Sequence, residues 1–212
     1  GRAKEMEVLV VEHPVVAERL TNIRRATTSN AVFRQNLYEI SIFLIYEALC
    51  DSQLDQIVVD TPLGQSDSFT LANQPMFVPI LRAGIGMLDA GLLMFPDATV
   101  GFIGAKRDEE TLLPEIYLNT IPNDLDGTRV VLLDPALATG GSVKQALELV
   151  AESDASEIII VTVLCSPEGI GAVKQSGLAA KVVTAAIDTN LNDVGFIYPG
   201  LGDAGDRQFG VD

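Results

Sequence analysis

The stretch RVVLLDPALATGGS, residues 129–142, changes character twice within a short distance. It begins as an apolar run, passes an acid at Asp134 and two glycines, and leads after Ser142 into the amphipathic segment VKQALELV. The apolar run is typical of a strand and the amphipathic segment of a helix. The run lacks polar alternation, which favours a strand covered on both faces and therefore an α/β fold with a mostly parallel sheet.

The turn between the expected strand and helix has the composition of a phosphate-binding loop. Gly140 and Gly141 permit positive φ angles and a close approach of the backbone to a ligand. Amides at the start of the helix favour a phosphate, and the hydroxyls of Thr139 and Ser142 add donors. Asp134 would repel a phosphate, so we expect it to accept hydrogen bonds from the hydroxyls of a ribose. The Gly-Lys-Ser/Thr ending of a Walker loop is absent, and an ordinary strand-to-helix turn remains the alternative.

The alternation of strand and helix continues from residue 76 onward. Further strands are expected at 76–81, 98–105, 157–165 and 181–187, and helices at 86–95, 142–152 and 167–177. Binding sites in open α/β sheets lie at the carboxyl ends of the strands. The candidate segments are therefore Arg82-Ala83-Gly84, Lys106-Arg107-Asp108, Asp134 to Ser142 and the region after Ile187.

The first third of the chain is expected to be helical. One helix begins at Pro14, and a second runs from Ser29 or Asn30 to about Cys50. His13 is the only histidine of the chain. A place at a helix start explains it better than a catalytic role, because a Ser-His-Asp triad would have to use it.

Two segments interrupt the regular pattern. The segment 109–127 predicts a protruding hairpin or flap, and DTPLGQSDS at 60–68 predicts a turn-rich connection. There is no repeat and no low-complexity linker, so we expect a single domain over residues 1–212. Residues 1–7 are expected to be a tag remnant or a disordered start.

The composition argues against two kinds of partner. Lysine and arginine number 14 against 29 aspartates and glutamates, a formal net charge of −15, so a broad basic face for nucleic acid is not expected. No apolar run approaches the roughly 20 residues of a membrane-spanning helix. Cys50 and Cys165 lie in apolar contexts and are expected to be reduced, buried thiols of a cytoplasmic protein, with a disulfide as the alternative.

Three motifs of the chain resemble those of a known enzyme family. They are VPILRAGIGM at 78–87, LLDPALATGGS at 132–142 and YPGLGDAGDRQFG at 198–210, supported by RDEET at 107–111 and SPEGI at 166–170. With them the chain resembles the type I phosphoribosyltransferases, and within these the uracil phosphoribosyltransferase family, over nearly all of residues 8–210. Pro135 stands where other branches commonly carry a second acid, and GLGDAGDR is the most discriminating piece.

The resemblance implies a fold and a reaction. The type I phosphoribosyltransferase fold is a mostly parallel central sheet flanked by helices, with a protruding β-arm or flap and a small C-terminal hood that binds the base. The implied reaction transfers 5-phosphoribosyl from 5-phosphoribosyl 1-diphosphate (PRPP) to N1 of uracil, giving UMP and diphosphate in pyrimidine salvage. No covalent intermediate is expected, which fits a chain without a plausible catalytic histidine or cysteine.

The resemblance also implies site residues by position. The catalytic residues would be Arg82, Arg107 and Asp203, the arginines because their guanidinium forks match phosphate oxygens. A surface arginine and a solvated charged loop are the alternatives for these two positions, and relatives often carry an aromatic residue in place of Lys106, whose role stays open. PRPP would be bound by Arg82, Arg107, Asp134, Pro135, Ala136, Leu137, Ala138, Thr139, Gly140, Gly141, Ser142 and Asp203. Uracil would be bound, largely by main-chain groups, at Ile197, Gly202, Asp203 and Ala204.

The implied cofactor is Mg²⁺, held by PRPP and water near Asp203, with no direct protein ligand expected. A homodimer or homotetramer and GTP as an allosteric activator are further family properties, and neither nucleic acid nor membrane is an expected partner. One alternative function is a regulator that senses PRPP or nucleotides while binding RNA or DNA, which the net charge disfavours. Another is a sister transferase for a purine, which Pro135 and the terminal loop disfavour.

Overall fold

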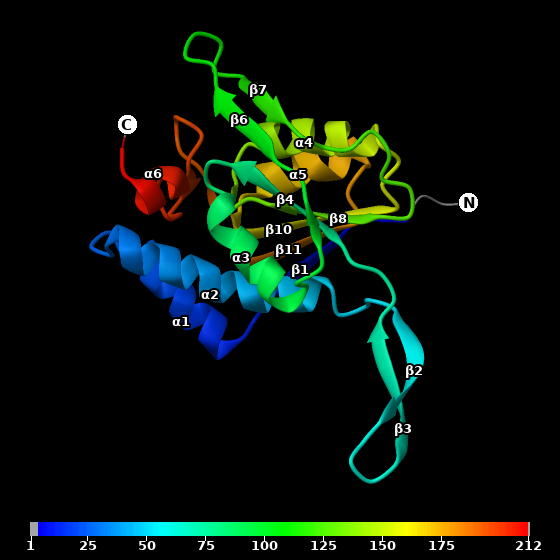
Figure 1. The fold of residues 1–212 in the computed structure, drawn as a ribbon. Coiled ribbons are helices and arrows are strands. Elements are labelled where there is room, and N and C mark those ends of the chain that lie inside the picture. Colours follow the sequence, from blue (N-terminus) through cyan, green and yellow to red (C-terminus); the bar gives the residue numbers. More distant parts are fainter. Residues whose placement is uncertain (1–3, 212) are drawn as a thin grey trace.

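The computed structural model describes residues 4–211, so the expectation of a tag remnant or disordered start lies outside the described residues for positions 1–3. A nine-stranded sheet forms the centre, and its strand pairs are parallel except for the pair at one edge (Figure 1). The strand order is β1 (Glu7–Val10), β11 (Lys181–Ile187), β10 (Glu157–Cys165), β8 (Arg129–Leu133), β4 (Met76–Leu81), β6 (Ile103–Arg107) and β7 (Pro114–Asn119), while β5 (Thr99–Val100) pairs with β4 and β9 (Ala136–Leu137) with β10.

Helices cover both faces of the sheet (Figure 1). In β8, Val131 and Leu133 pack into one apolar cluster, whereas Val130 and Leu132 pack into a second cluster on the other face. The mostly parallel sheet between helical layers, predicted from the apolar run at 129–133, is therefore confirmed. One cluster contains residues of α1 (Pro14–Arg24), α2 (Asn30–Ala48) and α3 (Ile85–Met94), and the other contains residues of α4 (Gly141–Ala151) and α5 (Pro167–Ser176).

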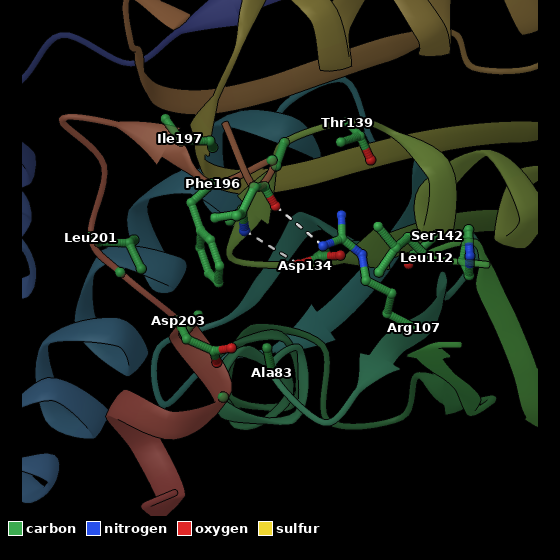
Figure 2. A pocket seen from close by; sticks show the side chains of 18 residues that line it. Ala83, Arg107, Leu112, Asp134, Thr139, Ser142, Phe196, Ile197, Leu201 and Asp203 are labelled. Carbon is green, nitrogen blue, oxygen red and sulfur yellow. Dashed lines mark hydrogen bonds between the residues drawn. The ribbon is translucent and has the colours of Figure 1, made fainter. Parts of the chain in front are cut away.

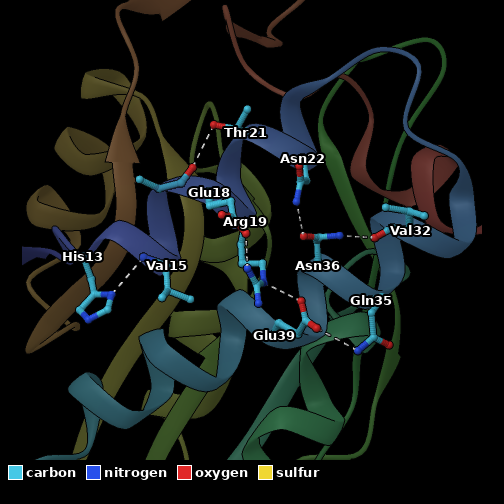
Figure 3. A network of polar contacts seen from close by, with 11 residues as sticks. His13, Val15, Glu18, Arg19, Thr21, Asn22, Val32, Gln35, Asn36 and Glu39 are labelled. Atoms are coloured by element: carbon cyan, nitrogen blue, oxygen red, sulfur yellow. Dashed lines mark hydrogen bonds and ion pairs between the residues drawn. The ribbon is translucent and has the colours of Figure 1, made fainter.

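Polar contacts fix α1 against α2 (Figure 3). His13 caps α1, because its Nδ1 accepts a hydrogen bond of 3.1 Å from a backbone N–H of the first turn, as the sequence predicted for a helix start. The Arg19 guanidinium donates to Glu39 at 2.7 Å, and the Asn22 amide donates to Asn36 at 3.0 Å. The position of α1 matters for the candidate site, because the last residue of this helix contacts the C-terminal part of the chain.

Two antiparallel hairpins leave the sheet (Figure 1). The hairpin of β6 and β7 confirms the protruding element predicted for 109–127. The hairpin of β2 (Leu54–Asp60) and β3 (Gln65–Leu71) corrects the expectation of a connection at 60–68. Its tight turn is closed by the Thr61 N–H, which donates to the Gly64 carbonyl at 2.7 Å. The strands are exposed along most of their length, so they lack the buried face by which a strand is recognised in sequence.

Three smaller expectations also have an outcome. Glu7 pairs with Lys181 in the sheet, so residue 7 does not belong to a disordered start. Cys165 is buried as expected, whereas Cys50 is exposed because it lies beyond the end of α2, and both thiols are free within the described chain. Across residues 4–211, none of the helices combines the length and the apolar character that crossing a membrane would need.

Candidate active site

Four segments meet at the carboxyl ends of the parallel strands around a cavity of about 340 Å³ (Figure 2). They are the turn after β4, the end of β6 with its hairpin, the turn after β8, and residues 194–205. A smaller hollow of about 200 Å³ adjoins the cavity, because both are lined by Ala83, Asp134, Ser142 and Asp203. This is the edge of the sheet at which the sequence predicted binding.

The turn after β8 brings the start of a helix to the cavity. Gly140 has a φ of +85°, and a Cβ atom there would lie 2.8 Å from Ala172 Cβ, so the turn requires glycine. The helix α4 begins at the next residue with glycine as its N-cap and without an acid in its first turn. Its first amides therefore favour a bound anion, and the side chains of Thr139 and Ser142 line the same cavity.

Asp134 is the acid at the end of β8. Burial between the cavity walls raises its pKa to about 7, and the Ala136 N–H, which donates to the carboxylate at 3.2 Å, offsets part of the rise. A carboxyl group with this pKa exchanges its proton near neutral pH. A cation or a set of hydroxyl donors beside it would favour the ionised form.

The turn after β4 packs tightly against the strands. A Cβ atom at Gly84 would collide with the Leu133 carbonyl oxygen and lie 2.7 Å from the Ile80 nitrogen, so only glycine lets this turn close. Arg82 lines the smaller hollow, and its Nη2 lies 3.0 Å from a carboxylate oxygen of Asp206. The turn thus presents a guanidinium beside the end of β8.

Arg107 ends β6 and connects the β6–β7 hairpin to the C-terminal part. Its Nη1 donates to the Val194 carbonyl at 3.2 Å, and a Cβ atom at Gly195 would lie 3.1 Å from its Nη2 (Figure 2). Leu112 and Pro114 of the hairpin line the same cavity. The hairpin therefore forms one wall of the cavity and contacts the opposite wall through Arg107.

The C-terminal hood, residues 188–205, is held by an ion pair between the buried Asp188 and the half-buried Arg24, which sequence reasoning missed. Two nitrogens of Arg24 donate to the two carboxylate oxygens of Asp188 at 2.8 and 2.6 Å. Asp188 also accepts the Gly200 N–H at 2.8 Å, and Arg24 donates to the Gly200 carbonyl at 2.9 Å. The Arg24 hydrogen bonds hold the pKa of Asp188 below its ordinary value. Sequence reasoning marked this region only by the end of the strand at Ile187. The ion pair itself leaves no local signal, because Arg24 lies 164 positions away from Asp188.

The end of the hood leads into a short capped helix. Asp203 caps the short helix α6 (Ala204–Phe209), since its carboxylate accepts the Asp206 N–H at 2.9 Å. Asp206 and Arg207 are neighbours in the sequence, but their side chains do not pair with each other. Instead Asp206 pairs with Arg82, while the Arg207 guanidinium lies 4.8 Å from the centre of the Phe33 ring. Helix geometry separates the two neighbours onto different faces.

The structure gathers most of the predicted site residues. Arg82 lines the smaller hollow, and the residues on the larger cavity are Arg107, Asp134, Ala136, Ala138, Thr139, Ser142, Ile197, Gly202, Asp203 and Ala204. Leu137 is buried in the core instead, and the Pro135 carbonyl accepts hydrogen bonds from two backbone N–H groups of β10. The side chains of these two residues therefore do not reach the cavity, and only their backbone is left for the predicted contact with PRPP. Sequence reasoning missed the apolar lining residues Leu112, Val194, Phe196 and Leu201, which no polar signal marks.

No group of three or more His, Cys, Asp or Glu side chains within residues 4–211 is arranged to hold a metal ion. Asp134 and Asp203 nevertheless both line the smaller hollow. Burial disfavours the charge on Asp134, which an added cation would stabilise. The site therefore fits a magnesium ion that brings most of its ligands from substrate and water.

The fold and the site define a type I phosphoribosyltransferase. The solved structure of the AQ2163 protein from Aquifex aeolicus is similar with a TM-score of 0.91 and 37% identity, over 97% of this chain and 99% of that one. A hypoxanthine-guanine phosphoribosyltransferase from Bacillus anthracis shares the fold alone, with a TM-score of 0.50 and 13% identity over 74% of this chain and 80% of that chain.

The branch within this class follows from the sequence relatives. A family model described as uracil phosphoribosyltransferase matches residues 10–211. The uracil phosphoribosyltransferase of Corynebacterium diphtheriae is 47% identical over 205 residues, 97% of each chain. The chain belongs to the uracil phosphoribosyltransferase family, and the resemblance drawn from its three motifs is confirmed.

Proposed function

We propose that this protein transfers the 5-phosphoribosyl group of PRPP to N1 of uracil, giving UMP and diphosphate in pyrimidine salvage. One observation carries the proposal: the start of α4, which favours a phosphate, and the glycine-containing chain of the hood line the same cavity. A single ligand can therefore extend from a phosphate at α4 to a base at the hood. Family membership supports the same reaction.

The donor is bound by groups at three strand ends. The amides at the start of α4, with Thr139 and Ser142, bind the 5-phosphate, and Asp134 accepts hydrogen bonds from the ribose hydroxyls. Arg82 and Arg107 bind the diphosphate, for which guanidinium forks are suited. Pro135, Ala136, Leu137, Ala138, Gly140 and Gly141 contribute backbone to this loop.

Uracil is recognised by the backbone of the hood, at Ile197, Gly202 and Ala204. Uracil presents an acceptor at O4 and a donor at N3, so a backbone N–H and a backbone C=O can pair with it. Cytosine reverses both positions and would leave buried groups unpaired, a mismatch that costs on the order of 10⁴-fold in kcat/KM. Gly202 has a φ of +81°, a conformation that glycine allows.

The reaction is a displacement at the anomeric carbon. A bond forms between uracil N1 and this carbon, the bond to the diphosphate oxygen breaks with inversion, and N1 loses its proton to solvent. Negative charge grows on the diphosphate, where Arg82 and Arg107 stabilise it. Leu112 and Pro114 of the β6–β7 hairpin cover the cavity and exclude water, which would otherwise hydrolyse the donor.

Mg²⁺ is the proposed cofactor; PRPP and water would hold it, with Asp203 beside it through a water molecule and Asp134 on the ribose hydroxyls rather than on the ion. When bound, it supplies positive charge to the diphosphate. Removal of magnesium by a chelator should abolish turnover, and readdition of magnesium should restore it. Full activity in excess chelator would exclude the cofactor.

The base specificity is tested by incubating the protein with PRPP, Mg²⁺ and labelled uracil, uridine, hypoxanthine or orotate. Labelled UMP from uracil alone is the expected result. Conversion of hypoxanthine alone would establish the purine alternative. Binding of PRPP without conversion of any base would favour the regulator that senses PRPP.

A homo-oligomer, either a dimer or a tetramer, completes the proposal, with the β2–β3 hairpin as a contact. Leu54, Val58 and Phe69 on this hairpin are 57%, 61% and 64% exposed, and an isolated two-stranded hairpin is marginally stable in water. Light scattering of the protein and of Val58→Asp tests the contact, which predicts a smaller particle for the variant. GTP added to the assay tests the expected activation.

We also place the reaction in the cytoplasm. Cys50 is an exposed free thiol, which persists where thiols are kept reduced. Cell fractionation with an activity assay tests the location, and recovery of the activity outside the cytoplasmic fraction would contradict it.

A further inference from the structure

Gln208 lies at the point where the two halves of the site meet. Its side chain is fully buried on α6. The amide Nε2 donates to the Ala83 carbonyl and to the Ala204 carbonyl, both at 2.9 Å. Ala83 belongs to the turn of Arg82, whereas Ala204 is the first residue of α6, at the end of the hood. The bond to Ala83 therefore connects the helix that follows the hood to this turn.

Stability alone does not explain a glutamine at this position. Its Oε1 is buried and has no hydrogen-bond partner within residues 4–211. A buried polar atom without a partner costs free energy of folding. A methionine has nearly the same length and would avoid this cost, so the reason for the amide lies in the two hydrogen bonds that Nε2 donates.

Gly86 leaves the space that this amide occupies. A Cβ atom at Gly86 would overlap Gln208 Oε1 and lie 3.0 Å from its Cδ. Gly86 is also the second residue of α3, where glycine is a poor helix former. The fit of α3 around the Gln208 amide is a second observation, independent of the hydrogen bonds.

We infer that Gln208 is a positioning residue that fixes the Arg82-Ala83-Gly84 turn relative to the hood. This inference rests on the proposed function, in which the turn binds diphosphate and the hood binds uracil. The ion pair between Arg82 and Asp206, at 3.0 Å, connects the same helix to the same turn. Through α6, the distance between leaving group and attacking base is held constant.

The first test is Gln208→Met, with Gln175→Met at an exposed position of α5 as the matched control. Loss of the hydrogen bond to Ala83 should lower kcat/KM about tenfold, while the melting temperature stays within about 2 °C. Amide hydrogen exchange of peptides covering residues 82–86 and 203–209 should become faster in this variant alone. Unchanged exchange in both peptides would overturn the inference.

The second test is Gly86→Ala, made in the native protein and in Gln208→Ala. The added methyl group should displace the amide and lower kcat/KM in the native background. Its effect should be smaller where the amide is already gone, because only the contact with Leu37 Cδ2 at 2.8 Å then remains. Equal effects in both backgrounds would overturn the inference. If the native protein transferred phosphoribose to no base, the proposed function would fail, and hydrogen exchange would still decide the role of Gln208.

Discussion

Replacement of Asp134 by asparagine separates what this carboxyl group does for the ligand from what it costs the fold. Burial raises the pKa of Asp134 to about 7 in the folded protein, against an ordinary value of 3.8. The folded state therefore binds this proton more tightly than the unfolded chain does. Asparagine has the same shape and carries no charge, so the variant removes the titration and leaves the packing in place.

The sign and size of the effect follow from linkage. Because the folded pKa is raised, the protonated group stabilises the fold, and this contribution is complete below about pH 4 and lost as pH rises through about 7. A rise of about three pKa units corresponds to roughly 4 kcal/mol, which partial exposure to the cavity reduces to about 2–3 kcal/mol. For a chain of this length, that corresponds to roughly 4–12 °C in melting temperature.

The assay is thermal and urea unfolding of the ligand-free protein and of D134N between about pH 5 and about pH 9. The variant is expected to be the more stable protein above about pH 7, and the difference should shrink as pH falls. Asp89→Asn, at an exposed position of α3, is the control. The same D134N protein should have a raised KM for PRPP. A stability difference that does not change with pH would refute the reasoning.

Three further predictions concern the segments around the cavity. Arg24→Met should lower the free energy of unfolding by about 2–4 kcal/mol, because Asp188 then loses the partner of a buried charge. Its KM for uracil should rise more than its KM for PRPP, and equal changes in initial-rate assays would count against a role in holding the hood. Gly84→Ala should lose PRPP binding in calorimetry, because the added Cβ collides with the Leu133 carbonyl; native affinity would show that the turn can shift without loss. Arg107→Met should lower kcat about 10²-fold or more with little change in melting temperature, and a drop in stability without a drop in kcat would make this arginine structural.

The central part of the fold could be predicted because its signals are local. The run before Asp134 indicates a strand, the two glycines indicate a tight turn, and the segment after Ser142 indicates a helix, and the three follow one another directly. The β2–β3 hairpin could not be predicted in the same way. Its strands are exposed on both faces, so no alternation of buried and exposed residues distinguishes them from a connection.

The location of the candidate site could be predicted where the backbone requires a particular residue type. Gly140, Thr139 and Ser142 stand in a short turn whose composition indicates a phosphate. Arg24 and Asp188 gave no such signal, because a pair so distant in sequence becomes visible only when α1 packs beside β11. The place of Phe196 on the cavity could not be predicted either, since an apolar residue in a loop has many possible environments.

Three features that weaken the fold lie at or next to the same cavity. Asp134 is desolvated, Gly140 adopts a positive φ, and α4 begins without an acid at its N-terminus. Each departs from what stability favours, and such departures concentrate at functional sites. A ligand that brings a phosphate to α4 and a cation to Asp134 would satisfy both groups at once, and its binding would stabilise the folded state by mass action. The acidic chain can therefore bind an anionic substrate, because the charge that matters is that of the few groups at the strand ends, whereas the net charge of −15 is spread over the whole molecule.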